Sequence, residues 1–340
     1  MTDRDRPRRR TLHRLLVLLG LAVTAVFGYL AIRNAHLDEV VDALGELDAI
    51  WLVPAALLLA VCVVLRAERW RSLFAAGSRP PFGATLSALL AGYFFNAVLP
   101  LRPGEVVRVV LLKRRVGASA AEAGATVIVE RAYDLTALLL LLFLAAPLLP
   151  DVTWLDAAAA LAAVVGIGLA AAIVVIAIWG ERPALALIRP LARFAPVTEE
   201  RLEAIAHSAL TGLAGLRSPR VAAAAFGWTV LSWLLLVASC SALLAGFETG
   251  LSTGDVLLAG LLVVVATNLV LILPSSPGAL GVFEAATVVA LKAFGVDDSL
   301  ALSYALVLHA LNLLPYIAAG AFVLRGSFRR TAAATANEVG

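Results

Sequence analysis

Cysteine is scarce in this chain, and its scarcity excludes several kinds of site. The 340 residues include two cysteines, Cys62 and Cys240, and both stand in apolar runs. Two isolated cysteines can form neither a zinc cluster nor a disulfide framework. We therefore expect no metal site, and we interpret both residues as small buried hydrophobic side chains rather than as a disulfide pair.

The sequence also lacks the short motifs that mark common enzymes. It has no GxSxG nucleophile turn, no Walker A loop, no HExxH zinc motif and no glycine-rich dinucleotide motif. The longest polar segment, residues 181–220, is too short for a soluble catalytic domain. We therefore predict that the chain is not an enzyme, needs no cofactor and does not by itself drive transport with ATP.

Charge is sparse as well, because charged residues make up 15% of the chain and hydrophobic residues 61%. The formal net charge is only +3, so nucleic acid is not an expected partner. A soluble domain does not need so much apolar surface, and the apolar runs are continuous rather than alternating. The sequence therefore predicts an all-α polytopic membrane protein with a single membrane domain over residues 1–340.

Arginine-rich loops set the expected topology, because Lys and Arg concentrate on the cytoplasmic side of membrane proteins. The expected full spans are 12–32, 50–65, 120–149, 157–179, 221–246 and 300–324. Arg66 and Arg69 then belong to a cytoplasmic flank, and both termini are cytoplasmic. We expect a multi-pass plasma-membrane protein whose first apolar run is an uncleaved span. Residues 36–48 alternate apolar and acidic positions at helical spacing, which predicts an amphipathic surface helix.

Two apolar segments are broken in the same way. Residues 96–105 read NAVLPLRPGE, and residues 268–284 read NLVLILPSSPGALGVFE. Proline and glycine interrupt a helix, and bare backbone persists at membrane depth only where protein or a watery cavity shields it. The residues that we assign to the two breaks are Asn96, Pro100, Pro103, Gly104, Asn268, Pro274, Pro277, Gly278 and Gly281.

The breaks predict two re-entrant helical hairpins, one around residues 83–112 and one around 256–294. The first would enter from the cytoplasm and the second from outside. The chain then divides into 12–49, a first repeat at 50–150, a connecting part at 157–220 and an inverted second repeat at 221–325. Paired broken segments point to the binding site of a transporter. The alternative is eight ordinary helices with coincidental Pro-Gly breaks.

Ionisable residues inside the apolar regions are costly and so are candidates for chemistry. A polar cavity at the hairpin tips could hold a charged headgroup, or the charges could simply pair with one another. We favour pairing for Glu130 and Asp134, and ligand contact for Arg102 and Arg108, because a planar guanidinium fits phosphate oxygens. The candidates for substrate binding are Arg102, Glu105, Arg108, Glu130, Arg131, Asp134, Ser275, Ser276 and Glu284.

Several of these residues also have an ordinary structural interpretation. Glu105 and Glu284 each follow a Pro-Gly break, where a carboxylate caps a helix N-terminus as readily as it binds a substrate. Ser275 and Ser276 could form a turn, and Asn96 and Asn268 could tie the broken backbone together. His309 is a candidate proton relay, although a satisfied core histidine is the commoner outcome.

Three motifs together resemble the lysylphosphatidylglycerol synthase transmembrane-domain family of flippase-like membrane proteins. They are NAVLPLRPGEVVRVVLL at 96–112, ERAYDLTALL at 130–139 and PSSPGALGVFEA at 274–285, and the likeness extends over about residues 11–325. The resemblance implies a domain that handles lipids; in full-length synthases it moves aminoacylated phosphatidylglycerol to the outer leaflet, and a soluble C-terminal domain makes that lipid. Since this chain ends at Gly340, we do not expect synthase activity from it.

Three hypotheses follow from the residues and the resemblance. The first is a lipid flippase whose ligand has an anionic or phosphate-containing headgroup. The second is a proton-coupled secondary transporter of a small polar solute, with Glu105, Glu284 or His309 carrying the proton. The third is a non-transporting partner that docks a glycosyltransferase or another lipid-modifying enzyme through residues 181–220.

Overall fold

The computed structural model describes residues 22–75, 77–100, 102–150, 218–270 and 276–339, with isolated positions between 160 and 175. Every regular element in these ranges is a helix, so the predicted all-α class is confirmed. Several predictions fall outside the described residues. They concern most of the 157–179 span, nearly all of 181–220, the first part of the 12–32 span, and Pro274 and Ser275.

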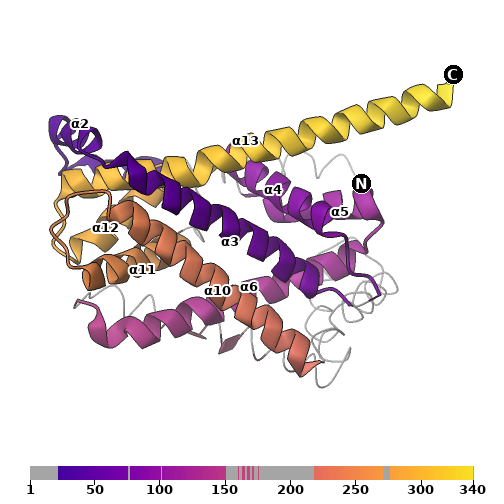
Figure 1. Cartoon of the computed structure of the whole chain (residues 1–340), viewed down its shortest axis with the longest axis horizontal. Helices are drawn as coiled ribbons and strands as arrows, with labels where there is room; N and C mark the ends of the chain where they lie inside the picture. The colour runs from indigo at the N-terminus through magenta and orange to yellow at the C-terminus, as the bar shows by residue number, and fades with distance from the viewer. Residues whose placement is uncertain are drawn as a thin grey trace, which may run out of the picture.

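Long helices form the body of the molecule (Figure 1). An apolar helix at Ala22–Ile32 precedes the other elements. In chain order these are α2 (Leu37–Gly45), η1 (Ala49–Trp51), α3 (Leu52–Ser72), α4 (Phe82–Val98), α5 (Gly104–Val116), α6 (Ala120–Ala145), η2 (Ala146–Leu148), α10 (Pro219–Leu244), α11 (Thr253–Val270), η4 (Pro277–Ala279), α12 (Val282–Lys292) and α13 (Asp298–Val339).

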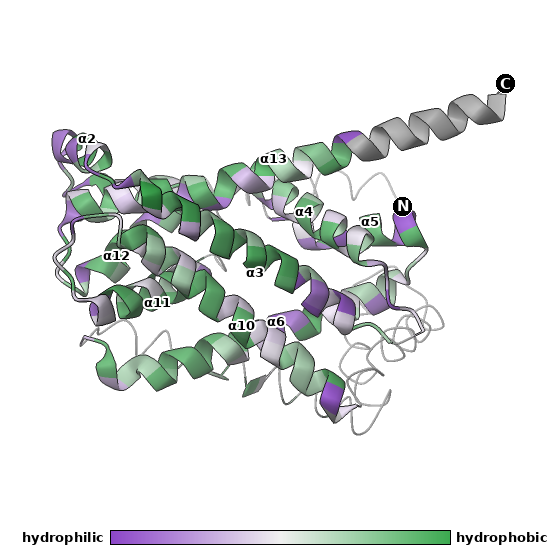
Figure 2. Ribbon diagram, viewed as in Figure 1, coloured by the Kyte–Doolittle hydropathy of each residue, from purple (hydrophilic) through white to green (hydrophobic). Residues whose placement is uncertain are grey.

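Four of the described helices are long and apolar enough to cross a membrane by length and composition. They are Ala49–Ser72, Arg220–Leu244, Thr253–Val270 and Asp298–Arg325. Apolar residues dominate their middle parts in Figure 2, whereas hydrophilic residues gather near the ends of the bundle and on α2. Large side chains such as Leu144, Leu314 and Phe322 are exposed on the outside, where lipid would cover them. The chain is a polytopic membrane protein.

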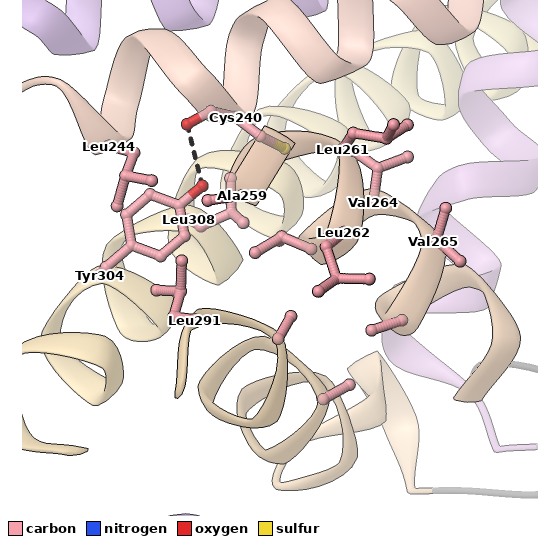
Figure 3. Packing of buried hydrophobic residues seen from close by; sticks show 14 of the residues in the cluster. Cys240, Leu244, Ala259, Leu261, Leu262, Val264, Val265, Leu291, Tyr304 and Leu308 are labelled. Carbon is pink, nitrogen blue, oxygen red and sulfur yellow. Dashed lines mark hydrogen bonds between the residues drawn. The ribbon is translucent and has the colours of Figure 1, made fainter. Parts of the chain in front are cut away.

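The largest buried cluster joins α3, α6, α10, α11, α12 and α13. Figure 3 shows its centre, where Tyr304 of α13 donates a hydrogen bond to the carbonyl oxygen of Cys240 at 2.9 Å. Neither cysteine is in a disulfide, and both are buried, as the sequence predicted. Small polar groups also join the helices, because the Ser239 hydroxyl donates to the Ala55 carbonyl at 2.7 Å between α10 and α3.

Two helical hairpins, α4–α5 and α11–α12, contain the two breaks. α5 has 13 residues and α12 has 11. At 1.5 Å per residue they are about 20 and 16 Å long, which is too short for a hydrocarbon core of about 30 Å. α11 is 18 residues long and apolar enough to cross. The second hairpin therefore pairs one helix of spanning length with a short one.

The open ends of the hairpins lie at opposite ends of α3, which Figure 1 shows as α4–α5 on the right and α11–α12 on the left. At the start of α3, the Asp48 N–H donates to the carbonyl of Gly246, shortly before α11 begins. Just after the end of α3, the Ala75 N–H and the Ser78 hydroxyl donate to Glu122 at the start of α6. This contact is close in sequence to the start of α4 and the end of α5, which form the open end of the first hairpin. The hairpins therefore enter the bundle from opposite ends.

The tips of the two hairpins meet inside the bundle, where α4 packs against η4. A Cβ atom on Gly278 would lie 3.5 Å from the carbonyl oxygen of Ala97. Unusual backbone makes both bends, with φ of +50° at Arg102 and +68° at Gly278. The predicted helix breaks are present at both places, whereas the assignment of 50–150 and 221–325 as an inverted repeat stays a prediction.

The amphipathic helix predicted at 36–48 is present as α2 and lies against the N-terminal end of α13. Val40 is buried, and its carbonyl accepts a hydrogen bond from Ser303 at 3.1 Å. Leu37 and Val41 are exposed. The helix therefore uses only part of its apolar face for packing against the protein, and a membrane surface remains our prediction for the rest.

The span predicted at 50–65 is longer in the structure, because α3 continues to Ser72. Arg66 and Arg69 were expected in a cytoplasmic flank, and that placement is wrong. Both are part of the helix, and Arg69 is only 3% exposed. Positive charge after an apolar run normally ends a span, but here carboxylates and an aromatic ring inside the bundle accommodate it.

Candidate ligand cavity at the hairpin tips

A cavity of about 220 Å³ lies where the two hairpin tips meet. Its wall is formed by α3, α4, α5, α6, α10, α11, η4, α12 and α13. Apolar side chains from α3, α10 and α13 line one part of it, while ionisable and amide side chains line the rest. The charged residues of the described chain that line it are Arg66, Arg69, Arg102, Arg108, Arg131, Glu105, Glu130 and Asp134.

Arg69 is at the centre of a buried ion-pair network. Its Nη2 donates to Glu130 Oε1 at 2.9 Å, and its Nη1 donates to Asp134 Oδ1 at 2.5 Å. The other Glu130 oxygen accepts from Arg108 Nη2 at 2.5 Å. Glu130 and Asp134 are four residues apart, so both face Arg69 from the same side of α6. The network joins α3, α5 and α6.

Two tryptophans complete this network. The Arg108 guanidinium lies 4.6 Å from the centre of the Trp70 ring, and Trp70 Nε1 donates to the Thr126 hydroxyl at 3.0 Å. Trp233 Nε1 of α10 donates to Asp134 Oδ1 at 3.2 Å. Buried charges are costly unless they are paired and hydrogen-bonded. These contacts pair every charge of the network, while the Nε atoms of Arg69 and Arg108 have no hydrogen-bond partner among the described residues.

A second pair lies nearer the open side of the cavity. Arg131 Nη2 is 2.8 Å from Glu105 Oε1, and the two side chains are 52% and 43% exposed. Arg131 also approaches Asp134 at 3.7 Å. Each of the three carboxylates in the wall is therefore within ion-pair distance of at least one arginine.

Arg66 differs from these arginines. Its guanidinium lies 5.0 Å from the centre of the Trp233 ring, and within the described part of the chain it makes no hydrogen bond and has no carboxylate within ion-pair distance. Its Nε, like those of Arg69 and Arg108, is buried without a hydrogen-bond partner there. Among the described residues, five arginines and three carboxylates line the cavity, and these give a net formal charge of +2 when His309 is counted as neutral.

The first hairpin is held by Asn96. The Asn96 Oδ1 atom accepts the N–H of Gly104 at 2.7 Å, which caps the start of α5. A Cβ on Gly104 would overlap both Asn96 Oδ1 and the carbonyl oxygen of Gly92. Asn96 thus ties the broken backbone together, as the sequence suggested, and only glycine allows α4 and α5 to approach so closely.

The second hairpin is held by Glu284 and His309. Glu284 Oε2 accepts the N–H of Gly281 at 2.7 Å and caps α12. Its Oε1 lies 2.6 Å from His309 Nδ1, and His309 Nε2 lies 2.8 Å from the carbonyl oxygen of Gly278. A carbonyl can only accept, so Nε2 carries a proton, and a second proton is shared between Nδ1 and the carboxyl group.

The remaining predicted residues lie around the tips. Asn268 lines the cavity, and its Nδ2 donates to the Val264 carbonyl at 2.8 Å. The Ser276 N–H donates to Thr24 Oγ1 at 3.1 Å, so this residue faces the first helix. Of the nine candidates for substrate binding, six line the cavity: Arg102, Glu105, Arg108, Glu130, Arg131 and Asp134. Whether any of them binds a substrate stays a prediction.

Sequence reasoning missed Arg66 and Arg69 as cavity residues. A signal was available, because Arg66, Arg69 and Trp70 lie at positions i, i+3 and i+4 and so share one helix face. ERAYD at 130–134 then offers Glu130 and Asp134 on a matching face. The rule that Lys and Arg concentrate in cytoplasmic loops predicts a cytoplasmic flank for these arginines instead.

Comparisons with known proteins agree with the fold. The family model described as "Lysylphosphatidylglycerol synthase TM region" matches residues 17–320. The chain is also 27% identical to "Glycosyltransferase AglD" of Haloferax volcanii, over 90% of this chain and 53% of that protein. The chain thus spans about half the length of this relative. These similarities indicate a membrane protein of lipid- or glycan-related processes, and the matched family region is a transmembrane region.

Proposed function

The chain belongs to the lysylphosphatidylglycerol synthase transmembrane-region family, and from this premise we propose that it moves a lipid with an anionic, phosphate-containing headgroup between membrane leaflets. The headgroup would enter the cavity at the hairpin tips while the acyl chains stay in the bilayer. The single observation that supports this most strongly is the net positive wall of a cavity formed by two helix breaks.

The size and lining of the cavity favour a small headgroup. Its volume of about 220 Å³ is below the ~300–1,000 Å³ of pockets that enclose whole drug-sized ligands. A lipid would place only its polar end there. Charged side chains at membrane depth cost free energy unless they have a partner or a function. Eight charged side chains around one cavity therefore favour a charged ligand.

Reconstitution tests the proposal. The full chain is inserted into liposomes that contain a trace of fluorescent phosphatidylglycerol, and a membrane-impermeant reductant reports which leaflet holds the label. We expect faster exchange than in protein-free liposomes, and a strongly reduced rate for the double variant Arg102→Ala/Arg108→Ala. Size-exclusion and circular dichroism profiles confirm that the variant is folded. Equal rates for wild type, double variant and empty liposomes would contradict the proposal.

A proton-coupled transporter of a small polar solute is the second candidate function. The Glu284–His309 contact supports it. Glu284 Oε1 and His309 Nδ1 are 2.6 Å apart, and this pair could gain and lose the proton between them during a transport cycle. Solute uptake driven by an imposed pH gradient, in liposomes where labelled lipids do not exchange, would favour this candidate over lipid movement.

The proposal includes a plasma-membrane location and cytoplasmic termini, and it assigns no catalytic step to this chain. A lipid-modifying enzyme would be a natural partner, since one relative is named a glycosyltransferase. Co-purification of such an enzyme with the tagged chain from membranes would test the partnership.

A further inference from the structure

Arg66 and two tyrosines line the cavity, and their side-chain donors make no hydrogen bond to a described residue. Arg66 belongs to α3, Tyr93 to α4 and Tyr316 to α13, and all three line the cavity. The two tyrosine rings pack together with their centres 4.6 Å apart. Within the described part of the chain, neither phenolic hydroxyl has a hydrogen-bond partner. We call these three residues the Arg–Tyr corner.

The position of Arg66 explains why its guanidinium can receive a ligand. The Arg66 guanidinium lies over the Trp233 ring, 5.0 Å from its centre, and its N–H groups make no hydrogen bond to a described residue, so they are available to a ligand. The carboxylate of Asp134 also lines the cavity, and its oxygens already accept from Arg69 and Trp233. Among the residues that the structure describes, the positive charge of Arg66 therefore has no counter-ion in direct contact.

We propose that the Arg–Tyr corner binds the oxyanion of the ligand, and that this oxyanion is a single phosphate group bearing one or two negative charges. Arg66 presents paired N–H donors that match two phosphate oxygens, and the hydroxyls of Tyr93 and Tyr316 each donate one further bond. The net charge of +2 on the cavity wall is balanced by an anion of this size. This inference rests on the proposed function for its lipid source, whereas a free phosphate monoester offers the same chemistry.

The corner also distinguishes Arg66 from the other arginines of the wall. Arg69, Arg108 and Arg131 each contact a carboxylate, so they hold helices together as well as carrying charge. Removing one of them disturbs packing. Removal of Arg66 leaves every described ion pair intact, so its loss should weaken anion binding with little effect on folding.

Equilibrium binding to the detergent-solubilised full chain tests the site. The probes are inorganic phosphate, glycerol 3-phosphate and dihexanoyl-phosphatidylglycerol, with the corresponding diacylglycerol as the uncharged control, and calorimetry reports affinity. We expect Arg66→Gln to weaken the phosphate-containing probe that binds wild type by about tenfold or more, because it loses a charge-assisted pair. Arg66→Lys should recover part of the affinity, and Tyr93→Phe/Tyr316→Phe should lower it several-fold while the ring stack remains.

Arg71→Gln is the matched control. Arg71 lies on the same helix, pairs with Glu68 at 2.8 Å and does not line the cavity, so its replacement should leave affinity unchanged. Unchanged affinity in Arg66→Gln, or equal binding of diacylglycerol, would overturn the inference. Binding of the lipid probe alone indicates a lipid source, and binding of glycerol 3-phosphate or phosphate alone indicates a soluble ligand.

The two proposals fail in different ways. If wild type binds phosphate through Arg66 but moves no labelled lipid in liposomes, the lipid-transport proposal fails and the anion site stands. If lipid exchange is fast and the same in Arg66→Gln, the anion site fails and transport stands.

Discussion

The two α3 arginines that line the cavity, Arg66 and Arg69, have unequal structural roles, and Arg69 has the larger one. It contacts two carboxylates of α6 at 2.9 and 2.5 Å, in a place where its side chain is 4% exposed. Removing one partner of a buried pair leaves the other charges uncompensated, which is far more costly than losing a surface pair. Arg69 is therefore a main contributor to the α3–α6 contact, beside the hydrogen bond from Trp70 to Thr126.

Replacing Arg69 by methionine should destabilise the protein by about 3–5 kcal/mol, because Glu130 and Asp134 lose their shared counter-ion. Arg71→Met removes a half-exposed pair with Glu68 and should cost no more than about 1 kcal/mol. Thermal and denaturant unfolding in detergent measure both variants. Similar unfolding midpoints for the two variants would show that the network contributes no more than a surface pair.

Glu284 can be tested for a structural role against a proton-carrying role. A glutamine in its place can still accept the Gly281 N–H and can donate to His309 Nδ1, so Glu284→Gln should retain stability within about 1 kcal/mol, whereas Glu284→Ala loses the cap and should cost about 1–3 kcal/mol. Thermal unfolding compares the two variants with wild type. If Glu284 carries protons, Glu284→Gln will be folded but unable to couple transport to a pH gradient.

At the scale of the hairpins, the close approach of two helices limits which residues can stand at their contact. Gly92 and Gly104 let α4 and α5 touch backbone to backbone at the start of α5. A methyl group added at either glycine must push the two helices apart. The hydrogen bond from the Gly104 N–H to Asn96 would then be lost. The first hairpin is therefore closed by the absence of side chains as much as by any hydrogen bond.

The substitution Gly104→Ala should lower the thermal midpoint and reduce any transport, since its Cβ would overlap Asn96 Oδ1 and the carbonyl oxygen of Gly92. Gly124→Ala in α6 is the control, because no atom lies within 4 Å of a Cβ at that position. Alanine has the higher helix propensity by about 1 kcal/mol, so this variant should be as stable as wild type or slightly more so. Equal effects at the two positions would rule out close packing as the reason for Gly104.

The helices and their breaks could be predicted from the sequence better than the contacts between side chains. Proline and glycine at 100–104 and 277–281 act on their own backbone, so both breaks could be located in advance. Which charges meet depends on how helices distant in sequence are arranged. Arg69 contacts residues 61 and 65 positions away. Helical spacing places Arg66, Arg69 and Trp70 on one face of their helix, but it does not say which helix that face meets. The corner made by Arg66, Tyr93 and Tyr316 could not be predicted for the same reason.

At the scale of the whole molecule, the opposite entry of the two hairpins gives a prediction about sidedness. Arg79 lies between α3 and α4, Glu248 lies between α10 and α11, and both are exposed. Cysteines placed at these positions should react with a membrane-impermeant thiol reagent from opposite sides, with position 79 reached from the cytoplasm. Cys62 and Cys240 are buried and should add little background. Labelling of both positions from one side would contradict the arrangement.

Helix α13 is attached to both hairpins, and this has a mechanical consequence. His309 is hydrogen-bonded to Gly278 at the tip of the second hairpin, while Tyr316 packs on Tyr93 of the first hairpin. Pro315 stands between these two attachments and cannot donate the usual backbone bond within the helix. If one hairpin swings outward while the other stays in place, α13 has to flex between residues 309 and 316, and Pro315 is the joint at which flexing costs least.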